Sequence, residues 1–145
     1  LNKLLIRILL HLQVEFSNND DSDDEIMSNK LRITIGSSSF DATLEDNETV
    51  KAFKKLLPMT VNMPDLNRNE KYYYLSGSLP TAASNPGTIL TGDLMLYGSN
   101  CVVLFYESFS TSYSYTRLGR VNNSSGLASA LGSGSVTVTF ELQKE

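Results

Sequence analysis

The stretch GDLMLYGSNCVVLFY, residues 92–106, holds two apolar runs joined by a short polar turn. The glycine, serine and asparagine at 98–100 suit a tight connection, so the two runs are predicted to pair as a β-hairpin. The second run, CVVLFY, is apolar at each position up to Phe105. A strand with this composition is expected in the centre of a sheet, with both faces covered.

Patterns typical of strands recur on both sides of this hairpin. Further strands are predicted at LRITIG, FDATL, MTVNM, KYYYL, YSYTRLGRV and SVTVTFEL. Two segments, residues 46–58 and 124–132, have the apolar spacing of short helices instead. About eight strands and two short helices predict a mainly β protein. We expect a closed or nearly closed β-barrel, because closure leaves no unpaired sheet edges.

The two predicted helices carry recognisable end signals. Asp46 or Asn47 can cap the first turn of the first helix through a side-chain oxygen. Pro58 is expected to end that helix, because proline has no N–H to donate and its ring clashes with the preceding turn. In the second helix, Leu127 and Leu131 lie one turn apart and share a face.

Residues 1–29 differ in composition from residues 30–145. The first segment holds two basic and six acidic residues, whereas the second holds ten of each. It begins with the apolar run LNKLLIRILLHLQVEF and continues as the acidic run SNNDDSDDE. We therefore divide the chain into a signal-like, acidic linker segment at 1–29 and a β-barrel domain at 30–145.

Two interpretations of the N-terminal segment stay open. Its order resembles an export signal and tether, as in an exported protein or lipoprotein of the cell envelope, although Arg7 and His11 interrupt the apolar run. Phe16 occupies the place where a lipoprotein would carry its lipid-modified cysteine. Alternatively, translation begins at Met27 and the protein is cytoplasmic. Contact with a membrane is expected only under the first interpretation.

The composition argues against several kinds of chemistry. The neutral domain offers no basic surface for a phosphate backbone, so nucleic acid is not an expected partner. Cys101 is the single cysteine and His11 the single histidine of the chain. A cysteine–histidine or serine–histidine active site is therefore not expected, and neither is a cysteine-based metal site. We predict no metal and no cofactor, and expect Cys101 to be a buried, unreactive thiol.

Four motifs, taken in order, resemble those of the bacterial cyclophilin-like domain proteins: LLPMTVNM, GDLMLYG, LFY and TRLGR. The resemblance extends from about Lys30 to Glu141. It implies a compact cyclophilin-type β-barrel with helices closing its ends. It implies no particular activity, since these proteins are mostly uncharacterised, and some of them are exported lipoproteins.

The resemblance also raises prolyl isomerisation, the activity of true cyclophilins. In that family the site resembles a fixed pattern: an arginine, a phenylalanine five positions after it and a glutamine three positions after the phenylalanine. A tryptophan and a histidine on loops complete it. The domain has no tryptophan, and its arginines do not fit this spacing: Arg32 precedes Ser37, Arg68 precedes Tyr73 and Arg117 precedes Asn122. The isomerase residues are thus not carried over, and whether the protein is an enzyme stays uncertain.

Arg117 is the leading candidate for a functional residue. In a strand, Tyr113, Tyr115 and Arg117 lie on one face. A guanidinium group beside tyrosine rings can stack on a ring and still bind a carboxylate or carbonyl group. The alternative is a structural role, in which Arg117 pairs with Asp93 or Glu107 or only covers a tyrosine.

The other candidates are mainly aromatic. Tyr97 and Phe105 are predicted walls of the same cavity, with core packing as the alternative. Tyr74 belongs to the run YYY, which must place rings on both faces of its strand. Asn62 can offer an amide to a ligand, with a solvated surface position as the alternative.

These residues favour a binding module that holds a small molecule or a peptide in a groove lined by aromatic residues and arginine. Two alternatives stay open. One is a peptidyl-prolyl cis-trans isomerase with a non-standard site, in which one arginine against an aromatic wall stabilises the twisted prolyl carbonyl. The other is a cell-envelope protein-interaction domain tethered by the acidic segment.

Overall fold

The computed structural model describes residues 28–144. The signal-like opening lies outside these residues, so its interpretation stays a prediction. Within them, eight strands have five or more residues and correspond to the eight predicted: β1 (Lys30–Ile35), β2 (Ser38–Leu44), β3 (Met59–Met63), β5 (Glu70–Tyr74), β7 (Asp93–Tyr97), β8 (Cys101–Phe105), β10 (Thr116–Val121) and β11 (Val136–Gln143). Three two-residue strands were not expected from the sequence: β4 (Asp65–Leu66), β6 (Thr88–Ile89) and β9 (Phe109–Ser110).

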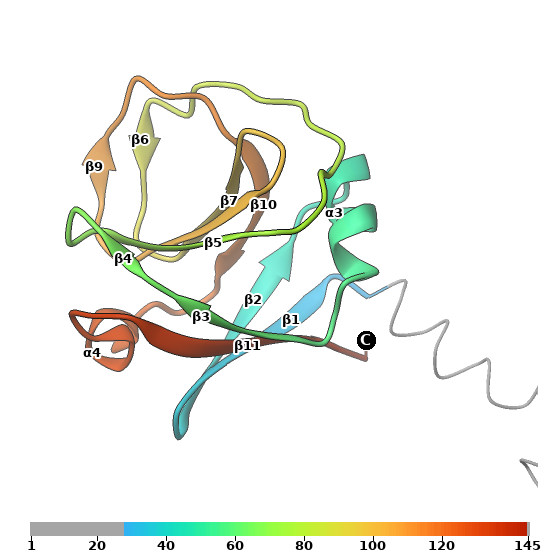
Figure 1. Cartoon of the computed structure of the whole chain (residues 1–145). Coiled ribbons are helices and arrows are strands. Elements are labelled where there is room, and N and C mark those ends of the chain that lie inside the picture. The colour runs from blue at the N-terminus through green and yellow to red at the C-terminus, as the bar shows by residue number, and fades with distance from the viewer. Residues whose placement is uncertain (1–27, 145) are drawn as a thin grey trace, which may run out of the picture.

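Nine of these strands form one antiparallel sheet in the order β3-β11-β1-β2-β10-β7-β8-β5-β4. The two end strands, β3 and β4, are separated in the chain only by Pro64. The carbonyl oxygen of Pro64 accepts a hydrogen bond from the backbone N–H of Tyr72 in β5, at 3.1 Å. The sheet is therefore a nearly closed barrel, as predicted (Figure 1).

The hairpin β7–β8 has the expected pairing, with Leu94 opposite Leu104 and Tyr97 opposite Cys101. All five residues of β8 are buried. Alternate residues face different apolar clusters: Val102 and Leu104 belong to the main barrel core, whereas the other three residues belong to a second cluster. The predicted central strand, covered on both faces, is thereby confirmed.

Two helices pack on the main core from opposite sides of the barrel, α3 (Glu48–Lys54) and α4 (Leu127–Leu131) (Figure 1). Asn47 caps α3, because its side-chain oxygen accepts a hydrogen bond from the Val50 N–H at 2.8 Å. The helix ends at Lys54, before Pro58, so the predicted end was too late. No helix within residues 28–144 has the length and apolar character needed to cross a membrane.

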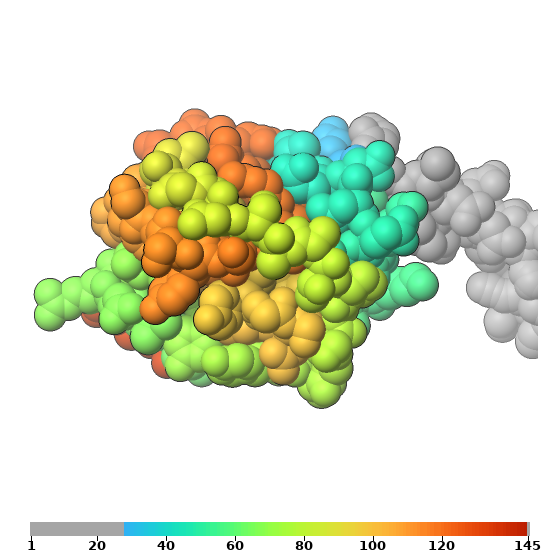
Figure 2. Space-filling view, turned by 90° about the horizontal axis from the view of Figure 1, so that it is seen from above, coloured from blue at the N-terminus to red at the C-terminus, as the bar shows by residue number. Residues whose placement is uncertain are grey.

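The second apolar cluster lies on the outer face of β5, β7 and β8. Two loops cover part of it: the one between β5 and β7, which contains β6, and the one between β8 and β10, which contains β9. They are joined by the β6–β9 pair and by two 2.9 Å backbone hydrogen bonds between Ser84 and Tyr115. Seen from above, the yellow-green and yellow residues of the first loop lie beside the orange residues of the second (Figure 2). This arrangement creates the site described next.

Candidate functional site

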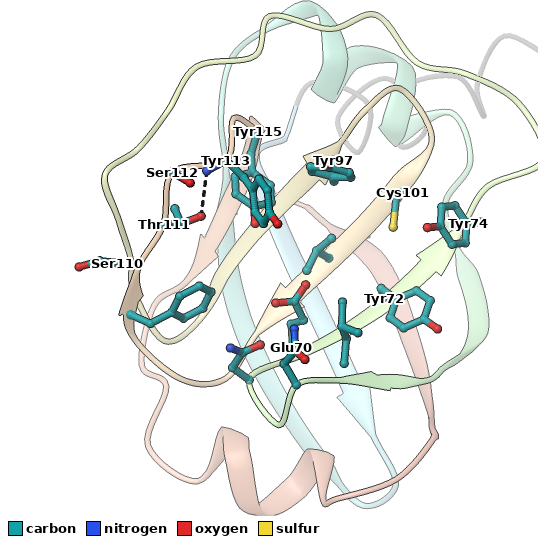
Figure 3. Close-up of a pocket in the computed structure, with 15 residues that line it drawn as sticks. Glu70, Tyr72, Tyr74, Tyr97, Cys101, Ser110, Thr111, Ser112, Tyr113 and Tyr115 are labelled. Atoms are coloured by element: carbon teal, nitrogen blue, oxygen red, sulfur yellow. Dashed lines mark hydrogen bonds between the residues drawn. The ribbon is translucent and has the colours of Figure 1, made fainter.

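A pocket of about 540 Å³ lies between the outer face of the sheet and the loop that contains β9. Five of the seven tyrosines of the chain line it: Tyr72, Tyr74, Tyr97, Tyr113 and Tyr115. Among the described residues its lining contains one ionisable carboxyl group, that of Glu70, and no lysine, arginine or histidine. Figure 3 shows Glu70 between Tyr72 and Tyr74 on one side and Tyr113 and Tyr115 on the other.

The period of two along a strand places the sheet side of this pocket. Glu70, Tyr72 and Tyr74 occupy alternate positions of β5 and therefore point to the same face. Cys101 of β8 lies opposite Tyr74 on one side and Tyr97 on the other, so these three residues form a row across three neighbouring strands. The strand register thus brings together residues that are far apart in the sequence.

The tyrosine rings contact one another in two groups. On the loop side, the ring centroid of Tyr97 lies 6.0 Å from that of Tyr113 and 5.6 Å from that of Tyr115. On the β5 side, the centroids of Tyr72 and Tyr74 are 5.8 Å apart. Tilted and edge-on contacts at these distances are favourable, so the rings within each group hold one another in place.

The Glu70 carboxyl group has an unusual environment. Among residues 28–144 it has neither a hydrogen-bond partner nor an ion-pair partner. Burial, together with the nearby Asp65 carboxylate, raises the pKa of Glu70 to about 7. Both effects disfavour the charged form, so the pocket holds an acid whose charge is poorly compensated by the protein.

Cys101 is a free, buried thiol in the same wall. Burial raises its pKa above the ordinary value, which confirms the expected buried thiol and leaves it a poor nucleophile at neutral pH. Within residues 28–144, no group of three or more cysteine, histidine, aspartate and glutamate side chains could hold a metal ion. The polar groups that line this pocket are tyrosine, serine and threonine hydroxyl groups, two asparagine amides, the Cys101 thiol and one carboxyl group.

The structure brings together four of the seven sequence-derived candidates, Tyr74, Tyr97, Tyr113 and Tyr115. Phe105 is fully buried behind them, with its ring edge-on to that of Tyr115 at 5.6 Å, so it packs in the second cluster and supports the pocket wall. The prediction that Phe105 lines the cavity therefore does not match its place in the structure.

Arg117 and Asn62 lie away from the tyrosine pocket. Arg117 lines a separate hollow with Arg120 and Glu45, which has no aromatic residue. Tyr113 and Tyr115 precede β10, which begins at Thr116, so the single strand expected to carry all three residues does not extend over the tyrosines. The expected structural partner, Asp93, instead pairs with Arg120 at 2.7 Å. Asn62 is an exposed residue of β3 and is not among the residues that line the pocket.

Glu70 did not stand out in the sequence, although a signal for it exists. In NEKYYYL the glutamate precedes Tyr72 and Tyr74 by two and four positions, so all three share one face of a strand. The local pattern does not show that a distant loop covers this face. That loop turns the face from a solvated surface into a pocket.

The raised pKa of Glu70 leads to a testable pH dependence of stability. The folded protein holds this proton more tightly than the unfolded chain, whose value is near 4.5. The protonated Glu70 therefore contributes its full stabilisation below about pH 4.5, and this contribution is lost as the pH rises through about 7. We expect Glu70→Gln, which stays neutral, to be more stable than the parent by about 1–2 kcal/mol at about pH 8, after discounting for solvent screening. At about pH 4 the two should be equal.

Chemical denaturation at several pH values measures this difference. Glu107→Gln is the matched control, since Glu107 is exposed and lies outside the pocket. The raised pKa would be contradicted if the free energy of unfolding of Glu70→Gln differed from that of the parent by the same amount at each pH.

The comparisons with known proteins agree with the fold. The model of the cyclophilin-like family matches residues 33–141, which is most of the chain. The chain belongs to the cyclophilin-like family. It is also similar to the solution structure of the hypothetical protein AF2241 from Archaeoglobus fulgidus, with a TM-score of 0.61 and 21% sequence identity, covering 80% of this chain and 95% of that one. No curated protein matches the chain.

Proposed function

We propose that this cyclophilin-like domain is a binding module that holds a small molecule or a short peptide segment in the tyrosine pocket. The pocket volume of about 540 Å³ falls within the range typical of small-molecule sites. Tyrosine suits this role, because its ring gives a large, rigid contact area and its hydroxyl group adds a hydrogen bond.

The observation that carries the proposal is the distribution of exposed apolar side chains. Six large apolar residues are exposed in the described part of the chain. Four of the six line this pocket: Leu66, Tyr74, Tyr97 and Tyr113. Single exposed apolar residues are normal on a protein surface, but their concentration around one hollow is typical of a recognition site.

The prolyl isomerase alternative receives less support from the geometry. It needs an arginine beside an aromatic wall, whereas no arginine lines the tyrosine pocket within residues 28–144. The second alternative, an envelope interaction domain, depends on residues that precede the described part. Binding in the tyrosine pocket is thus the function that the arrangement favours.

Removing a rim tyrosine should weaken binding without unfolding the domain. Tyr97 and Tyr113 are 46% and 60% exposed, so their replacement by alanine leaves the core intact. A fragment and short-peptide screen by NMR on the isotope-labelled protein would identify ligands, through shifts of the backbone amides that surround the pocket. We expect Tyr97→Ala and Tyr113→Ala each to lower the affinity of such a ligand by about tenfold.

Leu90→Ala serves as the control, because Leu90 is 42% exposed but does not line the pocket. It should bind the same ligand with unchanged affinity. The proposal would be wrong if ligands found in the screen shift amides elsewhere on the barrel, or if the two tyrosine variants bind as tightly as the parent.

A further inference from the structure

The pocket has an acidic group but no basic group to balance it. Glu70 is the only acidic or basic residue in its lining, within the part of the chain that the structure describes. The neighbouring cation on β5, Lys71, points to the other face and is fully buried. Its ammonium group is already bound to Asp65 at 3.0 Å and to the carbonyl oxygens of Gly132 and Gly134 at 2.9 and 2.6 Å. Lys71 therefore cannot neutralise Glu70.

A second hydrogen-bond acceptor lies beside Glu70. The side-chain oxygen of Asn69 is buried and has no hydrogen-bond partner, and Asn69 lines the same pocket. Buried polar atoms are normally paired, because an unpaired one loses its bonds to water without replacement. Two neighbouring acceptors without donors indicate that the complementary group belongs to a ligand and carries N–H or O–H bonds.

The tyrosines add a preference for positive charge. The face of an aromatic ring is electronegative and attracts cations placed within about 6 Å of its centroid. Here the Tyr72–Tyr74 pair lies on one side of Glu70 and the Tyr97–Tyr113–Tyr115 group on the other (Figure 3). Several rings around one carboxyl group are the combination by which proteins bind ammonium groups.

We propose that the ligand of this pocket carries a protonated amine, whose N–H groups donate to the Glu70 carboxylate and the Asn69 amide oxygen while tyrosine rings surround its alkyl stem. The inference rests on the proposed binding function and names its ligand class. The same ammonium chemistry occurs in a free alkylamine and in a lysine side chain of a peptide, and the volume of about 540 Å³ admits either.

The test compares two amine probes with a neutral one. Nα-acetyl-lysine methylamide, with a free ε-ammonium group, represents the peptide source and cadaverine the free amine. Nα-acetyl-norleucine methylamide is the neutral analogue of the lysine probe, with nearly the same stem. Binding can be followed by tyrosine fluorescence, since the chain has no tryptophan and most of its tyrosines line the pocket. NMR shifts of the amides near Tyr97 and Cys101 would place the probe.

We expect at least one amine to bind about tenfold or more tightly than the neutral analogue, and the tighter of the two identifies the source. Glu70→Gln should weaken amine binding by about tenfold or more and leave the neutral analogue unchanged. Glu107→Gln, which removes the same charge outside the pocket, should change neither.

Three outcomes would overturn the inference. If the neutral analogue shifts the pocket amides as strongly as the amines do, the pocket binds ligands but does not select a cation, so the proposed function survives and the inference fails. If the amines bind but Glu70→Gln retains their full affinity, the carboxyl group is not the recognition element. Absence of any amine binding rejects the ligand class, whatever the wider screen finds.

Discussion

Replacing Lys71 by methionine is expected to destabilise the domain by about 3–5 kcal/mol, the cost typical of breaking a buried ion pair by removing one partner. The Lys71 side chain is fully buried, and its ammonium group donates to Asp65 and to two backbone carbonyl oxygens. It also lies 5.2 Å from the ring centroid of Tyr106, whose hydroxyl group donates to the same Asp65 oxygen. Methionine has a similar length but offers no donor.

The consequence reaches beyond one ion pair. The two carbonyl groups belong to Gly132 and Gly134, in the segment that joins α4 to β11. Lys71 therefore connects β5 to the segment that leads into β11, which lies near the other end of the sheet order. Without it, three part-buried hydrogen bonds are lost at the place where the barrel closes.

Chemical denaturation of Lys71→Met beside Lys51→Met measures this effect. Lys51 makes an exposed pair with Glu48 at 3.0 Å, so its replacement should change the stability of the domain very little. Equal stabilities of the two variants would show that the Lys71 network is not important for barrel closure.

Much of the barrel could be predicted from the sequence, because its long strands carry a strong periodic signal. LRITIG and SVTVTFEL alternate over six or more residues, and both form strands with the expected buried face. The strands β4, β6 and β9 have only two residues each, too few to show any period. They are formed by contacts between distant loops, which a local pattern does not contain.

The candidate site was predicted only in part for a related reason. Alternation grouped Tyr113 and Tyr115 with Arg117, and Tyr97 was expected as a wall of the same cavity. The three tyrosines do lie at one pocket, but its second wall is a loop held by Ser84, which strand alternation does not describe. The same limit applies to Lys71. A lysine in a strand is usually solvated, and its burial depends on two carbonyl groups more than 60 residues away in the chain.

Gly119→Ala is expected to destabilise the domain by about 3 kcal/mol, at the upper end of what overpacking costs. Gly119 lies in β10 between two strands, opposite Leu44 of β2 and Leu94 of β7, where the register shifts. A Cβ atom at this position would lie 2.4 Å from the carbonyl oxygen of Thr43 and 3.1 Å from the Cα atom of Leu44. Both are backbone atoms of a paired strand, so no side-chain rotation can relieve the clash.

Gly77→Ala is the matched control, since a Cβ atom there meets nothing within 4 Å and its φ is not positive. This variant should equal the parent or gain about 0.4–1 kcal/mol, because alanine restricts the unfolded chain more than glycine does. Thermal and chemical denaturation of both variants would separate the two effects. If Gly119→Ala is as stable as Gly77→Ala, β2 and β10 can move apart without cost, and the close approach of these strands is not a requirement of the barrel. A large loss would instead explain why glycine stands at position 119, where two neighbouring strands leave no room for a side chain.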